Sequence, residues 1–192
     1  MNGEVTILTG PPGAGKTAVA EILSSGAGRP TVHLLTDSFY RSIRSGFVLP
    51  FLPAAQRQNE VVIEAIVQTV ATFARGGYDV VVDGIIGPWF LEPFRSLTER
   101  DALVLSYVVL RPDLATTVAR ATQRVGHELK DVEAITGLHA AFHGLGALES
   151  HTLDTAGLDP EETAAEVRRL VAEGAFRLDW EKAGRASTHT AS

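Results

Sequence analysis

The glycine-rich segment Gly10–Thr17 constrains the fold of this chain more than any other stretch of the sequence. It reads GPPGAGKT and matches the pattern G-x-x-x-x-G-K-[ST] at every required position. A β-rich run precedes it at residues 5–8, and apolar residues at helical spacing follow it, at Val19, Ile22 and Leu23. A strand that enters a helix through such a bend predicts an α/β fold with a phosphate-binding cradle.

The residue types of this cradle suit the polyphosphate of ATP and its magnesium ion. Glycines let the backbone curl so that successive N–H groups point at phosphate oxygens, and the positive end of the following helix adds to the attraction. We expect Lys16 to reach the β- and γ-phosphates and the Thr17 hydroxyl to ligate Mg²⁺. The predicted nucleotide-binding residues are Gly10, Pro11, Pro12, Gly13, Ala14, Gly15, Lys16 and Thr17. The alternative is a glycine-proline turn that carries a surface lysine.

A carboxylate at the end of a neighbouring strand forms the second half of such a site. The valine run 80–82 leads directly into Asp83, which places this side chain at the carboxyl end of a buried strand. There it is within reach of the water shell of Mg²⁺, so Thr17 and Asp83 are the predicted metal residues. The alternative is a simple Asp-Gly turn.

Strand and helix signals alternate along the rest of the chain. Continuous apolar strands suit a parallel sheet that helices cover on both faces, so the sequence predicts a three-layer α/β domain over residues 1–180. The tail 181–192 is small and polar and is expected to be disordered. The expected strands are 5–8, 31–35, 78–82, 102–110 and 150–153, and the expected helices begin near 16, 62 and 159. A long helical segment at about 120–146, broken by Gly126 and Gly137, fits the alternation poorly.

Composition restricts the class of partner. The formal net charge is -6, which argues against an electrostatic grip on nucleic acid. The chain has no cysteine, so disulfides and thiolate metal sites are excluded. The first residues lack a basic region and a long apolar run, so we expect a cytoplasmic protein without a membrane partner.

The order of these motifs resembles that of small P-loop kinases. Four features appear in the order that is seen in that group. They are the cradle, the stretch Thr36–Arg41 after the second strand, the Val80–Gly84 segment, and the pair Arg120 and Arg124. The chain is similar to the branch with chloramphenicol phosphotransferase, the zeta toxins and the kinase half of polynucleotide kinase, and to AAA family ATPases of that type. Over about residues 4–175 the resemblance implies a P-loop NTPase fold with a five-stranded sheet of order 2-3-1-4-5, ATP as donor, and a mobile helical lid.

The resemblance also assigns catalytic residues. It implies that Asp37 accepts the proton of the acceptor hydroxyl, which agrees with the need of phosphoryl transfer for a carboxylate that orients the nucleophile. It implies that Arg120 and Arg124 of the lid contact the transferred phosphate, beside Lys16. The alternatives are that Asp37 only caps the next helix, and that the two arginines form a solvated basic face.

The acceptor is less well defined. Arg41 and Arg44 could bind an anionic acceptor or be plain surface charge, and Gln56 and Asn59 could bond to the acceptor or simply start a helix. Trp89 and other aromatics could contact an acceptor with an apolar body or cover the end of the sheet. His139 and His143 lie four residues apart, but zinc needs further ligands, and lid packing is favoured.

The sequence therefore predicts an ATP-dependent phosphotransferase that acts on a hydroxyl group of a small molecule. The Asp-x-Asp of shikimate kinases is absent from the sequence, and the stretch 36–39 does not match the gluconate-kinase pattern, in which a leucine-histidine pair soon follows the aspartate. No named substrate therefore transfers. Two alternatives remain open: a kinase for the 5′ hydroxyls of nucleic acid, and an ATP-binding switch protein without an acceptor. A monomer and a homodimer are both compatible with the sequence.

Overall fold

One parallel sheet of five strands forms the centre of the computed structural model, which describes residues 1–26, 28–123 and 131–180. The strands lie in the order β2-β3-β1-β4-β5, and each neighbouring pair is parallel. The five-stranded sheet of order 2-3-1-4-5 is confirmed. The strands are β1 (Val5–Thr9), β2 (Thr31–Leu35), β3 (Asp79–Asp83), β4 (Leu105–Leu110) and β5 (Thr152–Leu153).

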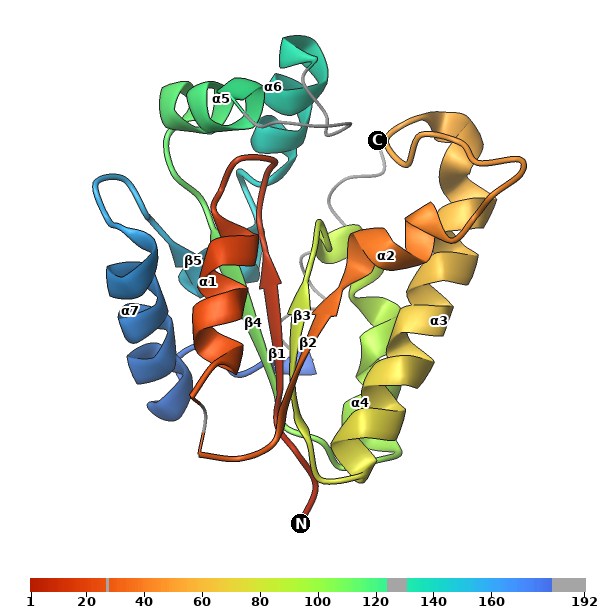
Figure 1. The fold of residues 1–192 in the computed structure, drawn as a ribbon, viewed down its shortest axis with the longest axis vertical. Coiled ribbons are helices and arrows are strands. Elements are labelled where there is room, and N and C mark those ends of the chain that lie inside the picture. The colour runs from red at the N-terminus through yellow and green to blue at the C-terminus, as the bar shows by residue number, and fades with distance from the viewer. Residues whose placement is uncertain (27, 124–130, 181–192) are drawn as a thin grey trace.

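Helices cover both faces of this sheet, so the predicted three layers are also confirmed. The helices α1 (Lys16–Ser24) and α7 (Pro160–Ala172) lie on one face, and α3 (Gln56–Arg75) and α4 (Arg95–Glu99) lie on the other (Figure 1). The helices α2 (Thr36–Arg41), α5 (Leu114–Gln123) and α6 (Val132–Ala141) lie beyond the carboxyl ends of the strands. Four short 3-10 turns complete the described elements: Pro53–Ala55, Pro88–Phe90, Glu92–Phe94 and Gly146–His151.

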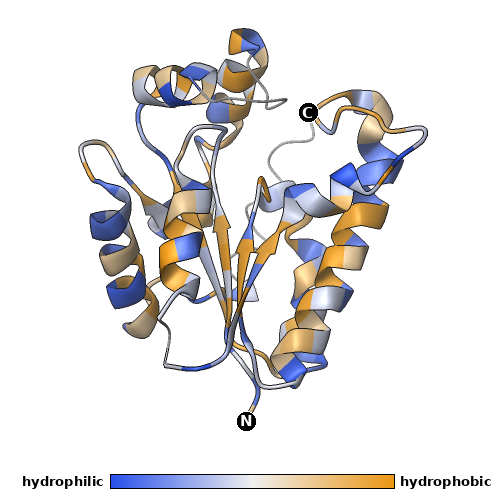
Figure 2. Cartoon of the chain, in the orientation of Figure 1, coloured by the Kyte–Doolittle hydropathy of each residue, from blue (hydrophilic) through white to orange (hydrophobic). Residues whose placement is uncertain are grey.

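The apolar core has two halves, one on each face of the sheet. Successive side chains of a strand point to opposite faces, so Val80 and Val82 pack in one half and Val81 packs in the other. Figure 2 shows the apolar colour on the strands and on the helix surfaces that face them. Because every central strand is covered on both sides, the sheet is a rigid platform for the loops at its carboxyl edge.

Caps define the boundaries of two helices. The α3 helix ends at Arg75 with Gly76 as its C-cap. The α7 helix begins at Pro160, close to its expected start, with a capping box: the Asp159 side chain accepts from the Glu162 amide, and the Glu162 carboxylate accepts from the Asp159 amide.

The α3 helix starts at Gln56, six residues before Val62, the first position of the apolar period. The interpretation of Gln56 and Asn59 as a polar helix start is therefore confirmed. The expected break at Gly137 is wrong. Gly137 does not break the lid segment, because it lies inside α6, where a glycine costs only about 1 kcal/mol relative to alanine. Gly126 and the tail 181–192 lie outside the described residues. Among the described helices, none is both long and apolar enough to cross a membrane.

Candidate active site

Three glycines of the Gly10–Thr17 cradle have backbone conformations that favour glycine. Their φ angles are 140° at Gly10, 83° at Gly13 and 88° at Gly15. A Cβ atom on Gly10 would lie 2.1 Å from the carbonyl oxygen of Leu110, and one on Gly13 would lie 2.4 Å from that of Thr117. The bend is therefore in close contact with the end of β4 and with α5, and side chains at these two positions would push these elements apart.

The ammonium group of Lys16 lies inside this bend. Its Nζ donates to the carbonyl oxygens of Gly10 at 3.0 Å and Pro11 at 2.9 Å, and the residue is only 8% exposed. Lys16 is also the first residue of α1, whose first-turn amides have no acceptor within the helix. The cradle thus places the ammonium group of Lys16 beside the positive end of a helix, which is a favourable environment for a polyphosphate.

Asp83 ends strand β3 beside the cradle, as predicted. It is paired in register with Leu8 of β1, and the next amide, that of Gly84, donates to the Leu8 carbonyl at 3.3 Å. Asp83 is 2% exposed, and its Oδ2 lies 3.1 Å from Nε2 of His33 on β2. His33 was not predicted, because its contact with Asp83 depends on how β2 and β3 pair.

The oxygen donors at this position fit magnesium. Mg²⁺ prefers hydroxyl, carboxylate, phosphate and water oxygens, and in nucleotide sites one or two protein groups hold it together with the phosphates. Thr17 on α1 and Asp83 supply two such groups. Within residues 1–26, 28–123 and 131–180, no cluster of three or more His, Cys, Asp and Glu side chains could hold a metal by itself. The donor set therefore suits an ion that arrives with a nucleotide.

Asp37 lies at the carboxyl end of the next strand, β2, in the first turn of α2 and exposed to solvent. The interpretation of Asp37 as a helix cap is wrong, because the N-cap residue is Leu35 and no side chain caps this helix. Burial and the negative charge of Asp37 together raise the pKa of Tyr40 to about 12. The side chain of Asp37 thus does not cap α2, and the neutral phenol of Tyr40 is its neighbour.

The start of α2 packs directly against the end of β3. A Cβ atom on Gly84 would lie 1.9 Å from Oγ1 of Thr36, and Thr36 is buried. Leu35 and Asp83 are paired in register across the two strands. Asp37 and Asp83 therefore project from two adjoining strand ends.

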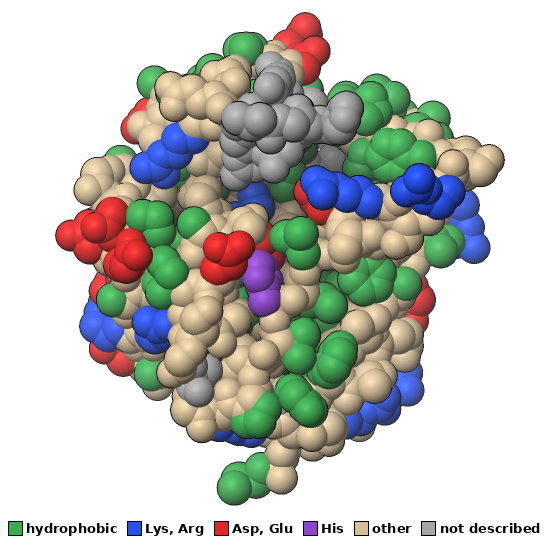
Figure 3. Space-filling model, in the orientation of Figure 1, with side chains coloured by type: hydrophobic (Ala, Val, Ile, Leu, Met, Phe, Trp, Pro, Cys, Tyr) green, Lys and Arg blue, Asp and Glu red, His purple; other side chains and the backbone are tan. Residues whose placement is uncertain are grey.

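The predicted arginines lie around this edge. Arg120 is an exposed residue of α5, and its predicted partner Arg124 lies outside the described residues. Arg41 is the last residue of α2, Arg44 follows in the loop, and both are exposed. Figure 3 shows basic side chains over α2 and the loop after it.

The polar residues predicted to contact the acceptor make contacts within the protein. The Gln56 amide donates to Glu60 Oε1 at 2.9 Å, and the Asn59 amide donates to the carbonyl oxygen of Pro50 at 2.8 Å. Asn59 is 5% exposed, and its Oδ1 has no hydrogen-bond partner among the described residues. These bonds support the loop before α3, and a role for either residue in acceptor binding stays a prediction.

Trp89 lies on the loop between β3 and α4. It is 49% exposed, and its ring centroid is 5.8 Å from that of Phe142, a buried residue directly after the lid helix α6. His139 of α6 is buried, and its Nε2 lies 3.0 Å from the carbonyl oxygen of Pro112 at the end of β4. His139 thus belongs to the packing of α6 against the segment that follows β4.

Arg111 joins the same lid region to the sheet and was not predicted. Its guanidinium donates to both carboxylate oxygens of Glu149, at 3.2 and 2.9 Å, and to the carbonyl oxygen of Phe142 at 2.6 Å. The hydrogen bonds that Glu149 accepts from Arg111, and next the one from the Leu145 amide, lower the pKa of its carboxyl group. The two residues are 38 positions apart in the chain, so no local pattern could pair them.

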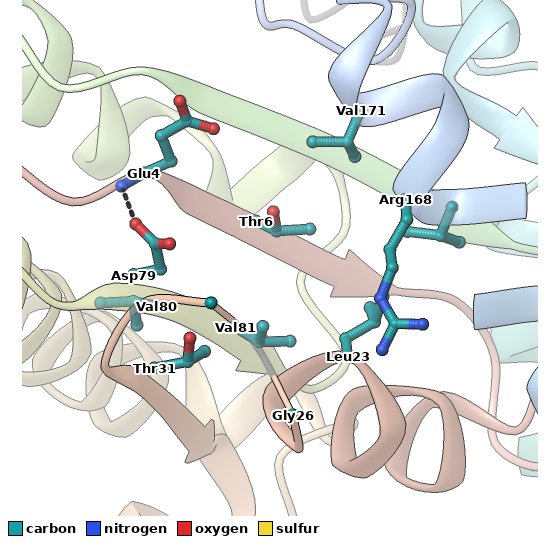
Figure 4. Close-up of a pocket in the computed structure, with 12 residues that line it drawn as sticks. Glu4, Thr6, Leu23, Gly26, Thr31, Asp79, Val80, Val81, Arg168 and Val171 are labelled. Carbon is teal, nitrogen blue, oxygen red and sulfur yellow. Dashed lines mark hydrogen bonds between the residues drawn. The ribbon is translucent and has the colours of Figure 1, made fainter. Parts of the chain in front are cut away.

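A cavity of about 380 Å³ lies at the opposite, amino edge of the sheet (Figure 4). Its lining residues come from the strand starts and from the helices α1 and α7. Figure 4 shows the Asp79 carboxylate bonded to the Glu4 amide, at 2.9 Å, rather than directed at a ligand. The lining includes none of the predicted site residues. The candidate active site is therefore the open carboxyl edge and not this cavity.

Comparison with known proteins identifies the fold. A family model described as an AAA domain matches residues 5–144. No curated protein matches the sequence. Among solved structures, the chain is similar to a tunicamycin resistance protein of Deinococcus radiodurans, with 17% identity, a TM-score of 0.65, and coverage of 92% of this chain and 99% of that one.

Two further solved structures are kinases by name. A gluconokinase from Sinorhizobium meliloti 1021 is 18% identical with a TM-score of 0.60, and the match covers 91% of this chain and 97% of that one. The APS kinase of Mycobacterium tuberculosis, in complex with AMPPNP and APS, is 18% identical with a TM-score of 0.61, over 89% and 98% of the two chains. The fold is therefore the predicted P-loop kinase fold. The comparisons do not single out the chloramphenicol phosphotransferase and zeta toxin branch.

Proposed function

We propose that this chain, which belongs to the AAA domain family, is an ATP-dependent phosphotransferase that moves the γ-phosphate of ATP to a hydroxyl group of a small molecule. One observation carries the proposal: the cradle with its buried Lys16 lies beside two strand ends that present Asp83 and Asp37. A nucleotide-binding protein without an acceptor has no need of an exposed carboxylate at the position of Asp37, after the end of β2.

The donor half of the site would hold ATP through backbone amides and Lys16. The ammonium group is already positioned by the carbonyl oxygens of Gly10 and Pro11, so little order is lost when phosphates bind. Thr17 and Asp83 would hold Mg²⁺, which neutralises charge on the phosphate oxygens when bound.

The acceptor half would use Asp37 as the base. The acceptor oxygen forms a bond to the γ-phosphorus, its proton passes to the Asp37 carboxylate, and the bond from this phosphorus to the bridging oxygen of ADP breaks. Arg120, together with Arg124 as inferred from the sequence, would stabilise the negative charge on the transferred group. Asp37 suits this role because it is exposed and does not cap its helix.

The acceptor would carry an apolar body. The loop between α2 and α3 exposes large apolar side chains at close spacing, and exposed apolar patches often mark ligand-binding surfaces. Hydrogen bonds from the Gln58 amide to Val48 and from Asn59 to Pro50 hold this loop in a fixed shape. The exposed side chains are Phe47 (46%), Leu49 (48%), Phe51 (40%) and Leu52 (41%). Arg41 precedes this loop, Arg44 lies in it, and both would favour an acceptor that also carries negative charge.

The test is incubation of the purified protein with Mg-ATP and a library of metabolites and antibiotics, followed by mass spectrometry for phosphate adducts. We expect adducts on a hydroxylated compound with an apolar body, and none with a Lys16→Met variant. A parallel incubation with labelled ATP and 5′-hydroxyl oligonucleotides separates the nucleic-acid kinase. Tight ATP binding without transfer in either assay would support the switch protein and refute the proposal.

A further inference from the structure

His33 is in direct contact with the carboxylate assigned to magnesium. Its Nε2 lies 3.1 Å from Asp83 Oδ2, and the side chains are 22% and 2% exposed. A carboxylate oxygen accepts, so this ring nitrogen carries the proton and donates. Because a buried carboxylate needs hydrogen bonds, His33 supplies one that the site cannot easily replace with water.

The sheet places the two residues at this contact. His33 of β2 is paired in register with Val81 of β3, so both side chains lie on the same face of the sheet. Asp83 is two residues after Val81 and therefore projects to that face as well. The α1 helix, which begins with Lys16 and Thr17, covers the same face (Figure 1). His33 thus approaches Asp83 from the edge strand, while the cradle and the start of α1 lie on the other side of β3, along the central strand β1.

We propose that His33 is a positioning residue for the magnesium site: its Nε2–H donates to Asp83 and holds the carboxylate in the orientation that serves the ion of a bound nucleotide. The proposal rests on the role of Asp83 given under the proposed function. Residues that bond to metal ligands in this way change metal affinity by about 10- to 100-fold when they are replaced. His33 does not contact ATP in this account, so it acts only through Asp83.

Two substitutions separate the hydrogen bond from the volume of the side chain. His33→Leu keeps a comparable size and removes the donor. His33→Gln keeps an N–H donor at a similar distance from the backbone. The measurement is calorimetry of ATP binding to the full chain, once with excess Mg²⁺ and once with EDTA, with thermal unfolding as a check on folding.

We expect His33→Leu to weaken ATP binding about 10-fold in Mg²⁺ and to leave binding in EDTA unchanged, since only the metal-dependent part passes through Asp83. His33→Gln should recover most of the loss. In an Asp83→Asn background, His33→Leu should cause no further loss, because the two residues act as one unit.

Three results would overturn the proposal: equal binding by His33→Leu and the parent protein in Mg²⁺, a similar loss with and without Mg²⁺, or parent binding that does not depend on Mg²⁺. If His33→Leu fails to fold, His33→Asn, which is polar but shorter, replaces it in the same comparison with His33→Gln. The outcome is independent of the transfer assay. Failure to phosphorylate any compound in the library would refute the phosphotransferase and leave the binding result standing.

Discussion

Arg111 binds Glu149 through two parallel hydrogen bonds, from Nη1 to Oε1 at 3.2 Å and from Nη2 to Oε2 at 2.9 Å. Arg111 directly follows β4, whereas Glu149 lies in the 3-10 turn that leads to β5. The same guanidinium also binds the Phe142 carbonyl next to α6, and Glu149 accepts from the Leu145 amide at 2.9 Å. Arg111 thus joins the end of β4 to the segment between α6 and β5.

We expect Arg111→Lys to lower the free energy of unfolding by about 1 kcal/mol, because lysine cannot form the bidentate pair and the contact is partly exposed. Urea denaturation measures this change. Arg169→Lys is the matched control, since Arg169 binds Glu166 and Glu173 on the exposed surface of α7 and its loss should cost less than that of Arg111. Equal losses in the two variants would show that Arg111 has no special role.

The stability of the protein should rise with pH between about 5.5 and 7.5 because of His151. Burial lowers the pKa of His151, which lies against Tyr107 with its Nδ1 3.0 Å from the Tyr107 carbonyl oxygen. In this pH range the unfolded chain binds more protons than the folded one, so folding is favoured as the pH increases. His151→Asn keeps a hydrogen-bond donor near the position of Nδ1 but does not titrate. In this variant the urea midpoint of unfolding should therefore depend less on pH. A slope of the same size in that variant would assign the effect to other groups.

Gly13 and Gly15 should respond differently to alanine. Both have positive φ, but a Cβ on Gly13 meets the Thr117 carbonyl, whereas a Cβ on Gly15 meets nothing within 4 Å. We expect Gly13→Ala to lose about 3 kcal/mol of stability, from overpacking and backbone strain together. Gly15→Ala introduces only the strain of an alanine at positive φ and should lower the free energy of unfolding by about 1 kcal/mol. Thermal or urea unfolding without nucleotide distinguishes them, and similar losses would mean that α5 can move away from the cradle.

Asp37→Asn should abolish transfer to an acceptor and leave ATP binding nearly unchanged. Loss of a general base typically costs about 10²- to 10⁴-fold in rate. Glu161→Gln is the control, because Glu161 is also an acidic residue in the first turn of a helix but lies on α7. Rates come from product formation with the acceptor identified in the library, and binding comes from calorimetry. Transfer at the parent rate by Asp37→Asn would exclude it as the base.

The donor half of the site could be predicted because its signals are local. Gly10, Lys16 and Thr17 lie within eight residues, and the valine run places Asp83 at a strand end without knowledge of the other strands. The parallel sheet followed from continuous apolar runs, and its strand order was implied by the resemblance. Short-range patterns of this kind are read directly from one sequence.

Contacts across the sheet could not be predicted in the same way. His33 meets Asp83 only because β2 and β3 pair in one register, and Arg111 meets Glu149 across 38 positions of the chain. The apolar period placed the start of α3 too late for a different reason. The residues 56–60 are mostly polar and exposed, so they carry no apolar period, and their helix is an extension of the buried part from Val62 onward.

The close packing of Thr36 against Gly84 determines which part of this fold can change without moving α2. It fixes the beginning of α2, and with it the position of Asp37 relative to the end of β3, before the chain enters the loop that leads to α3. Under the proposed function, this loop alone could be replaced while Asp37 stays in place. Grafting the corresponding loop of another protein of this fold should then change which acceptor is bound and leave the position of Asp37 unchanged.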